Sequence, residues 1–411
     1  MVKSNERTGS SRPITTALIL AGTTLLMVVP LGNVIAGGQA PRNTGDLRSS
    51  ERAAHGGPAS KTSQDEGRRL FRKETFGGNG RTCETCHSKN TGTISPADVQ
   101  ERFQANPNDP LFLHDGLDNG VQGISRIMEH ATIRIVRPLP PNIKIAGDPS
   151  AASVVLLRGI PGTINTPALD PALMYDLRAR NLSDQALDAI HDHAQNTVEP
   201  TAEQLALIAE FQRTDKRFFS SDVLQEFAGG GPAPEIPPGK TASEQRGRLM
   251  FVETPLTPGS TNGICAQCHS GPMLNQTSPF NTGAPPGARI ANIGVSERNL
   301  LNLPEYTFLI DDGFGNVQSV RMPDLGIPFT NPRPPGVPPP FVRHPAFFAG
   351  FFKIPTLWGV TKTAPYFHDN SANTLEEVAA FYTNMFANGP DPLQLTAQDE
   401  ADMVAYLKLL R

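Results

Sequence analysis

The sequence predicts a mainly α-helical protein whose chain divides into two similar domains with long loops rich in proline and glycine. Three observations support this fold class. The chain has 411 residues, which is more than one hydrophobic core usually serves. Its 39 prolines and 37 glycines indicate long loops between modest helices. A short pattern also occurs twice, each time ahead of a pair of cysteines.

The repeated pattern marks the expected start of each domain. Residues 67–71 read GRRLF and residues 247–251 read GRLMF, and each stretch precedes its cysteine pair by about the same distance. Between the repeats, residues 228–239 read AGGGPAPEIPPG, which offers no apolar face to bury. We therefore expect domains at residues 37–227 and 240–411, with residues 228–239 as the linker.

Four helices can be predicted from their caps and apolar spacing. We expect helices at residues 183–195, 201–213, 374–386 and 396–410. Thr201 with Gln204 and Thr374 with Glu377 match the capping box, in which two side chains satisfy free backbone amides. In the last helix, a stripe of apolar side chains is expected to be core: Met403, Tyr406, Leu407 and Leu410.

The N-terminus is typical of an export signal. Basic residues precede an apolar run of 16 residues, 14–29, and small residues suitable for cleavage follow up to Ala36. A membrane span needs roughly 20 apolar residues, so a cleaved signal at residues 1–36 is favoured over an uncleaved anchor. The sequence thus predicts a periplasmic protein.

The net charge of the chain is −4, and −6 without residues 1–36, which carry three basic side chains and one acidic one. This balance argues against nucleic acid as a partner. A mildly acidic surface could meet a basic electron donor, although net charge does not define a docking site. The sequence leaves a homodimer open.

All four cysteines lie in two C-x-x-C-H motifs: Cys83, Cys86 and His87 form the first, and Cys265, Cys268 and His269 the second. In this motif two thiols on one turn form thioethers with a haem, and the histidine binds its iron. Two disulfides would leave the adjacent histidines unexplained. A zinc site lacks a compact set of further ligands, and a thioredoxin-like pair would not occur twice. We expect two covalently bound haems c in two cytochrome c-like domains.

Beyond these motifs, the chain resembles the dihaem cytochrome c peroxidase and MauG family. Residues 353–369 read KIPTLWGVTKTAPYFHD, and they closely resemble the second-haem domain of that family. Residues 165–169 (NTPAL) and 174–179 (MYDLRA) agree more loosely with its first domain. The resemblance implies that the first haem meets hydrogen peroxide and that the second relays electrons from outside.

For the second haem, the family's distal ligand lies fourteen residues after the histidine of the PYFH stretch. That count from His368 reaches Tyr382, which shares an inward helix face with Val378 and Phe381. A methionine here is typical of the peroxidases and a tyrosine of MauG-like proteins. Met385, one turn further, is an alternative ligand, and a core tyrosine without a ligand role is another.

For the first haem, the family places a displaceable histidine sixteen residues after the motif histidine, where this chain has Phe103. His114 and His130 lie within a longer segment, and each is more often a surface or hydrogen-bonded histidine than a ligand. We therefore expect His87 to be the only protein ligand of the first iron.

Peroxide cleavage needs an acid/base group, which in the family is a glutamate. Residues 195–199 (QNTVE) match its motif and make Glu199 the favoured candidate, with His193 as the rival. Glu199 could instead be an ordinary charge at a helix start. Tyr175 occupies the position of a tryptophan that passes electrons between the haems in the family, although an aromatic residue packed on porphyrin would look the same.

Two further positions are less defined. The family binds calcium partly through backbone carbonyls, and Thr363 and Pro365 match those positions. Trp358, the only tryptophan, replaces a common arginine and has no assigned role.

The favoured function is reduction of hydrogen peroxide with electrons from a small cytochrome c or a cupredoxin. One alternative is a MauG-like, high-valent oxidation of a protein or organic substrate, which Tyr382 would favour. The other is a dihaem electron carrier without catalysis, which would need a second strong ligand on the first iron.

Overall fold

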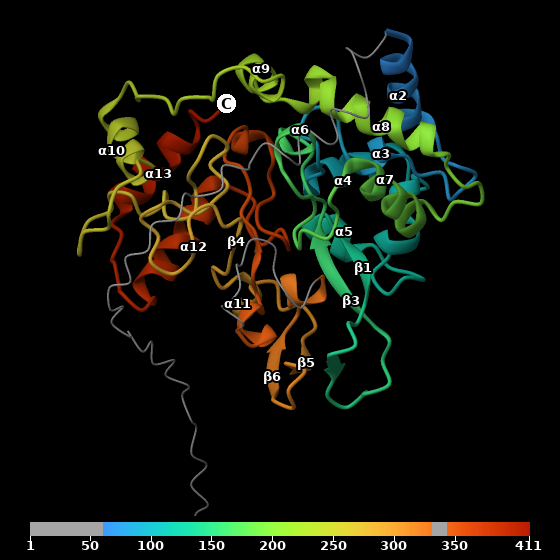
Figure 1. Cartoon of the computed structure of the whole chain (residues 1–411). Helices are drawn as coiled ribbons and strands as arrows, with labels where there is room; N and C mark the ends of the chain where they lie inside the picture. Colours follow the sequence, from blue (N-terminus) through green and yellow to red (C-terminus); the bar gives the residue numbers. More distant parts are fainter. Residues whose placement is uncertain (1–60, 331–342) are drawn as a thin grey trace, which may run out of the picture. The chain divides into compact units, whose positions relative to one another are not determined.

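The computed structural model describes residues 61–330 and 343–411 (Figure 1). The expected signal, residues 1–36, lies outside the described residues. Helices are the main regular structure, which confirms that part of the predicted fold class, and three small sheets accompany them. Within the described ranges, no helix combines the length and the apolar character that crossing a membrane requires.

The α-helices have the following bounds: α2 (Lys61–Lys73), α3 (Cys83–Cys86), α4 (Pro96–Ala105), α5 (Ser125–His130), α6 (Thr166–Leu169), α7 (Leu182–Ala189), α8 (Ala202–Thr214), α9 (Asp222–Ala228), α10 (Ala242–Met250), α11 (Val295–Arg298), α12 (Leu375–Ala387) and α13 (Ala397–Leu407). The short 3-10 helices are η1 (Pro110–Phe112), η2 (His114–Gly116), η4 (Lys216–Phe218), η5 (Ile327–Phe329), η6 (Pro345–Phe348) and η7 (Val360–Lys362), and the π-helical turn η3 spans Ile190–Ala194.

The two repeated segments form helices that pack in the same way. α2 packs on α8, and α10 packs on α13. A Cβ on Gly67 would lie 2.3 Å from the carbonyl oxygen of Leu207, and one on Gly247 would lie 2.0 Å from that of Asp402. Glycine is therefore required at the equivalent position of both helices, because any side chain would separate the packed pair.

The expected capping residues begin their helices. Thr201 and Gln204 form both hydrogen bonds of the capping box at the start of α8. At the start of α12, the hydroxyl of Thr374 accepts from the amide of Glu377, but the Glu377 carboxylate accepts from the amide of Asn373. Both boundaries agree with the predicted helices to within a residue.

The predicted helix at residues 183–195 changes its winding near its end. α7 ends at Ala189, and residues 190–194 form the π-helical turn η3. Asn79 binds this turn, with its side-chain amide donating to the carbonyl of His193 and its backbone amide to that of Ala194, at 3.0 and 2.8 Å. π-turns are frequent at functional sites, which draws attention to the side chains of η3.

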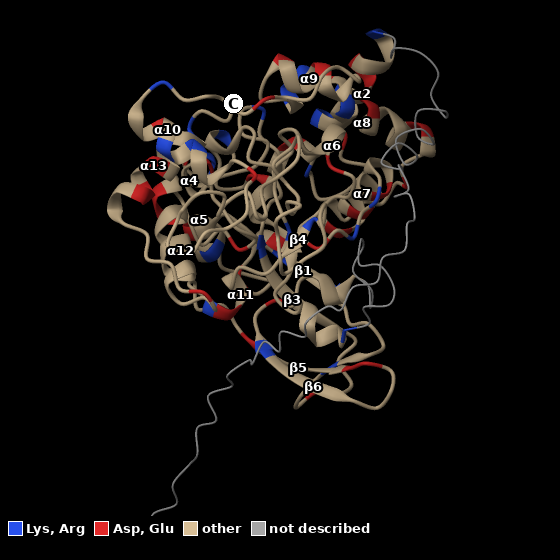
Figure 2. Ribbon diagram, turned by 60° about the vertical axis from the view of Figure 1, so that its left-hand side comes forward, with Lys and Arg blue, Asp and Glu red and all other residues tan. Residues whose placement is uncertain are grey.

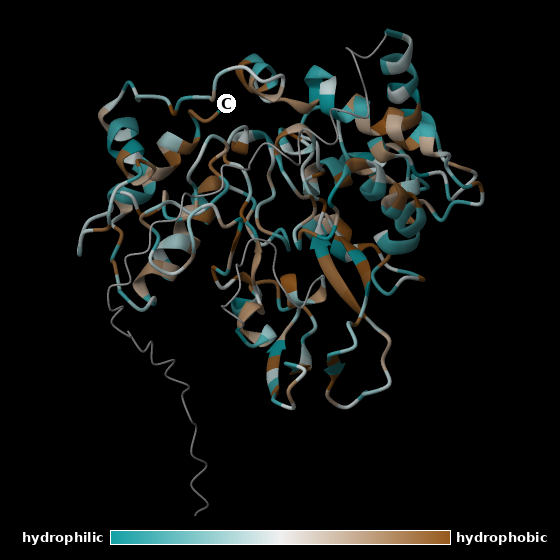
Figure 3. Ribbon diagram, in the orientation of Figure 1, coloured by the Kyte–Doolittle hydropathy of each residue, from teal (hydrophilic) through white to brown (hydrophobic). Residues whose placement is uncertain are grey.

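The sheets join segments that are distant in sequence. β1 (Thr132–Pro138) pairs antiparallel with β3 (Ser153–Gly159), and both carry apolar residues (Figure 3). β2 (Ile143–Ile145) pairs with β5 (Tyr306–Asp311), which pairs with β6 (Val317–Met322). β4 (Ile290–Ala291) pairs with β7 (Phe352–Lys353). β2 therefore belongs to a sheet whose other strands come from the second predicted domain.

The apolar core consists of clusters at the two packed helix pairs and at the strands. Leu70 and Phe71 of α2 are buried with Phe211 of α8. The predicted stripe on the last helix is buried as expected, with exposures of 0–4% for Met403, Tyr406, Leu407 and Leu410. A separate cluster combines β1 and β3 with Phe308 and Phe329 from later in the chain. The domain boundaries at residues 227 and 240 stay a prediction.

Candidate functional site

The first C-x-x-C-H motif is one turn of helix, α3, with His87 as its C-terminal cap. The Nδ1 atom of His87 lies 2.9 Å from the carbonyl oxygen of Gly92. A carbonyl can only accept, so Nδ1 carries the proton and Nε2 keeps its lone pair for a metal. Burial, opposed by the hydrogen bond to Gly92 and assisted by the nearby charges of His193 and Arg217, lowers the pKa of His87 to about 4.

The second motif repeats this arrangement. The Nδ1 atom of His269 lies 2.8 Å from the carbonyl oxygen of Leu274, five residues further on, as Gly92 is from His87. His269 is 9% exposed, and burial lowers its pKa. In both histidines Nδ1–H is thus bound to a backbone carbonyl, and Nε2 keeps its lone pair.

The four cysteines form no disulfide. Burial raises the pKa of Cys83 to about 12 and that of Cys86 and Cys268 to about 11, and it also raises that of Cys265. Half-buried, unpaired thiols beside an oriented imidazole fit the donor set of haem c at each motif. Among the described residues, no group of three or more His, Cys, Asp or Glu side chains could hold a bare metal ion.

Close to the first motif, His193 on η3 is paired with Asp115. Its Nδ1 atom lies 2.6 Å from Oδ2 of Asp115, whose other oxygen accepts from Arg81. Arg81 is 2% exposed and also donates to the carbonyl of Leu111 at 2.9 Å. Burial by itself would raise the pKa of Asp115, but the hydrogen bond from His193 and the charge of Arg81 outweigh it and lower this pKa.

The pairing with Asp115 sets the tautomer of His193. The proton lies on Nδ1, between the imidazole and the carboxylate, and Nε2 can accept another. The His193 side chain is 22% exposed, so it is open to a small reactant but largely enclosed. Sequence reasoning identified His193 but missed Arg81 and Asp115, which are distant from it in the chain.

The structure places Glu199 on the surface. Its side chain is 65% exposed, and both carboxylate oxygens lie 3.0 Å from Nε2 of His191. The other histidines near this region have ordinary partners: Nε2 of His114 lies 3.1 Å from the carbonyl of Asp192, and His130 is 3.8 Å from Glu129. Phe103 packs edge-on against Phe112, with ring centroids 5.3 Å apart.

Near the second motif, α12 carries Tyr382 towards the cysteines. Tyr382 is half-buried against the core cluster that also includes Cys265. Burial raises the pKa of the Tyr382 phenol, and the adjacent Cys268 and Cys265 raise it further. Met385, one turn on, is half-buried as well. The structure thus brings the predicted ligand Tyr382 together with the second motif.

Tyr175 lies where segments of the two predicted domains meet. Its ring is 6.4 Å from that of His368 in an edge-to-face arrangement, and burial raises the pKa of its hydroxyl. His368 is 5% exposed and stacks on Phe352 with centroids 3.7 Å apart. The rings of Tyr175, His368 and Phe352 therefore lie in sequence, and His368 belongs to the stretch 353–369 that resembles the family.

Trp358 acquires a structural role. Its indole N–H donates to the carbonyl of Pro272, three residues after His269, at 2.8 Å. Its own carbonyl accepts from the side-chain amide of Asn165 at 2.9 Å. Trp358 therefore ties the loop of the second motif to the stretch 165–169 of the first predicted domain.

A buried ionic cluster adjoins Tyr175 and His368. Arg158, 2% exposed, donates to Asp176 at 2.8 Å and to Asp324 at 2.6 and 3.0 Å. Burial favours the neutral form of both acids, but the charge of Arg158 outweighs it and lowers the pKa of each. Asp176 lies within the stretch 174–179 that carried the resemblance, whereas no sequence pattern pointed to Arg158 or Asp324.

The predicted calcium positions lie in the turn after η7. The hydroxyl of Thr363 donates to the carbonyl of Val360 at 3.2 Å, and Pro365 follows two residues later. Calcium stays a prediction.

Comparison with known proteins gives the following relatives. No protein-family model matches the chain. The chain is 26% identical over 211 residues to cytochrome-c peroxidase IdrP1 of Denitromonas iodatirespirans, over 50% of this chain and 48% of that protein. It is 29% identical over 148 residues to cytochrome-c peroxidase IdrP2 of Pseudomonas sp. (strain SCT), over 36% and 35% of the two chains. These matches span about half or less of the curated relatives.

Two solved structures are also similar. One is a MauG-like protein associated with microbial copper homeostasis, with 20% identity, coverage of 93% of this chain and 95% of that chain, and a TM-score of 0.45. The other is the diheme peroxidase BthA from Burkholderia thailandensis E264, with 16% identity, coverage of 86% of each chain and a TM-score of 0.45.

Proposed function

From the premise that the chain is a relative of the dihaem cytochrome c peroxidases and MauG proteins, we propose that it is a periplasmic dihaem c-type peroxidase. The electron donor would be a small cytochrome c or a cupredoxin. The first domain, residues 37–227, would hold one haem c through Cys83, Cys86 and His87. The second, residues 240–411, would hold the other through Cys265, Cys268 and His269.

The observation that carries this proposal is the parallel state of the two motif histidines. In both, Nδ1 lies within 2.9 Å of a backbone carbonyl five residues downstream, and Nε2 is left to bind iron. Haem c would supply an iron that binds peroxide at the first motif and an electron relay at the second. Two electrons and two protons convert hydrogen peroxide into two molecules of water.

His193 is the group that we propose for proton transfer. Its Nε2 can accept a proton from peroxide and return one to the departing oxygen, while Asp115 holds Nδ1–H and balances the charge that forms. The charge of His193 affects the pKa of His87, which supports a position close to the first motif. Glu199 is the candidate that the family resemblance favours, but its exposure of 65% and its pairing with His191 support it less.

The test is peroxide-dependent oxidation of a reduced small cytochrome by the holoprotein. His193→Ala should lower kcat/KM by a factor on the order of a hundred or more, because general acid–base catalysis contributes about that much. Glu199→Gln should change it little. His191→Ala is the matched control, because it lies on the same π-turn and contacts Glu199 rather than Asp115. The opposite pattern, with activity lost in Glu199→Gln alone, would transfer the role to Glu199.

A MauG-like oxidation of a protein or organic substrate is the second candidate. Tyr382 favours it, because a phenol beside Cys265 and Cys268 could bind the second iron and stabilise its oxidised forms. A holoprotein that consumes peroxide without oxidising any small redox donor, and that instead oxidises an added organic substrate, would support this candidate over the peroxidase.

A further inference from the structure

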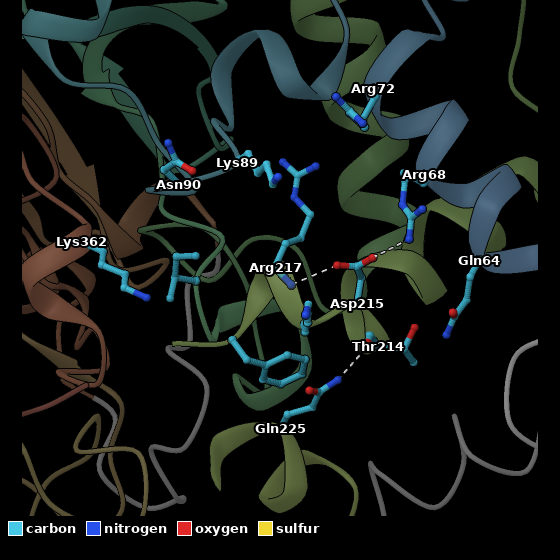
Figure 4. A pocket seen from close by; sticks show the side chains of 13 residues that line it. Gln64, Arg68, Arg72, Lys89, Asn90, Thr214, Asp215, Arg217, Gln225 and Lys362 are labelled. Carbon is cyan, nitrogen blue, oxygen red and sulfur yellow. Dashed lines mark hydrogen bonds and ion pairs between the residues drawn. The ribbon is translucent and has the colours of Figure 1, made fainter. Parts of the chain in front are cut away.

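A basic cavity lies beside the first motif, on the side of α2 and η4. Its volume is about 1020 Å³, and its walls come from α2, the loop after His87, η4 and η7 (Figure 4). The walls carry six basic side chains: Arg68, Arg72, Lys89, Lys216, Arg217 and Lys362. Figure 4 shows that the labelled ones among them approach the cavity from separate segments.

Acidic groups compensate only part of this charge. The one carboxylate in the wall, Asp215, is bound by Arg68 at 3.1 Å. Arg72 and Arg217 both bind Glu84 of the first motif, at 2.7 and 2.9 Å. The arginines are thereby held in place by carboxylates, with guanidinium groups still at the wall.

The three lysines differ from the arginines. Across the part of the chain that the structure describes, no carboxylate lies within ion-pair distance of Lys89, Lys216 or Lys362, and all three are exposed. Away from the cavity, as on α10, acidic and basic residues are interspersed (Figure 2). Three lysines without an ion pair are thus gathered in one wall, in a chain whose net charge is negative.

The lining of the site favours a small, charged ligand. The hollow is open to solvent, and its volume lies near the upper end of the range for small-molecule sites. Neutral hydrogen-bonding side chains, those of Gln64, Asn90 and Thr214, alternate with the cations in its wall. Arginine forks and lysine ammonium groups together are the groups that bind phosphate oxygens.

We propose that this cavity binds a small, multiply charged oxyanion of the phosphate class. The bound anion would be held by Lys89, Lys216 and Lys362 together with Arg217. Because Nη2 of Arg217 lies 3.5 Å from the carbonyl oxygen of His87, the anion would add negative charge next to the segment that carries the first motif. This site is independent of the peroxidase activity and requires only the fold described above.

The probe is pyrophosphate, titrated calorimetrically into the holoprotein at constant ionic strength. Saturable binding at one site per chain is expected. Lys89→Gln, Lys216→Gln and Lys362→Gln combined should raise Kd about tenfold or more, because three favourable charge contacts are lost while the arginines stay paired. Lys144→Gln is the matched control, since Lys144 is an exposed lysine on β2, away from this wall, and its substitution should leave Kd unchanged.

Haem content and thermal unfolding of each variant separate loss of the site from loss of the fold. The proposal is wrong if pyrophosphate shows no saturable binding, if the triple variant binds as the unsubstituted protein does, or if Lys144→Gln weakens binding equally. It is also wrong if pyrophosphate does not bind but the triple variant accepts electrons more slowly from an acidic redox protein. The cavity would then be a docking surface for that protein.

Discussion

The Nδ1 atom of His193 lies 2.6 Å from a carboxylate oxygen of Asp115, 78 residues away in the sequence. Arg81 binds the other carboxylate oxygen and two carbonyl groups of the same loop, those of Leu111 and Leu113. The carboxylate is therefore fixed from both sides. A carboxylate held in this way orients the imidazole and stabilises its protonated form, which is what a proton-transferring histidine needs.

Asp115→Asn tests this orientation. We expect peroxide turnover by the holoprotein to fall by a factor on the order of ten to a hundred, because the amide cannot balance a positive charge on His193. Asp192→Asn is the control, since Asp192 is exposed on the same π-turn. Asp115 acts as a positioning residue, so the pH profile of turnover should change as well as its rate. An unchanged profile in Asp115→Asn would contradict this role.

Haem attachment can be tested through the cysteines. Denatured protein from a host with haem-attachment machinery should retain two haems per chain, because thioether bonds survive unfolding. Replacing Cys83 and Cys86 by alanine should leave one haem and remove peroxide turnover. Replacing Cys265 and Cys268 should also leave one haem but stop the electron supply. Mass spectrometry that finds four unmodified cysteines in the unsubstituted protein would refute the assignment.

The ligand of the second iron can be read from the absorption spectrum. If Tyr382 binds, the oxidised protein should lack the sulfur-to-iron band at the red end of the spectrum, and Tyr382→Phe should alter the spectrum and the potential. Met385→Ala should alter neither. If a sulfur band is present and disappears in Met385→Ala, while the spectrum of Tyr382→Phe is unchanged, Met385 is the ligand of the second iron. The conventional peroxidase is then favoured.

The buried cluster around Arg158 should contribute strongly to stability. Asp324→Asn is expected to lower the free energy of unfolding by about 3–5 kcal/mol at neutral pH, because it leaves part of a buried charge unpaired. Urea unfolding followed by circular dichroism measures this change. Glu305→Gln, which breaks an ion pair whose arginine is 74% exposed, should cost at most about 1 kcal/mol.

The same cluster predicts a pH dependence. Asp176 and Asp324 have folded-state pKa values below the ordinary range of Asp. Their contribution is therefore complete above the unfolded-state pKa, near 4, and is lost as the pH falls through the folded-state values. The difference in stability between the unsubstituted protein and Asp324→Asn should thus decrease in acid. A difference that persists unchanged at low pH would exclude an ionic origin.

Local sequence determined the features that depend on neighbours along the chain. The two C-x-x-C-H motifs, the caps at Thr201 and Thr374 and the buried stripe on α13 are set by spacing within one or two helical turns, and the structure has the predicted caps and stripe. The repeated pattern at residues 67–71 and 247–251 was also visible in the sequence. In both of its helices the packed helix leaves no room for a Cβ on the glycine, Gly67 or Gly247. Tyr382 was reached by the fourteen-residue count from His368 that the family resemblance implies, and the period of the helix places it on one face with Val378 and Phe381.

Tertiary structure decided what depends on segments far apart. Arg158 meets Asp324 across 166 residues, and His193 meets Asp115 across 78, while the matching glutamate of the family motif, Glu199, lies exposed. The sheet of β2 with β5 and the basic cavity likewise combine separate segments. A charged or polar side chain carries no periodic signal that specifies its partner. Its role is set by burial, because only a low-dielectric site makes the pairing necessary.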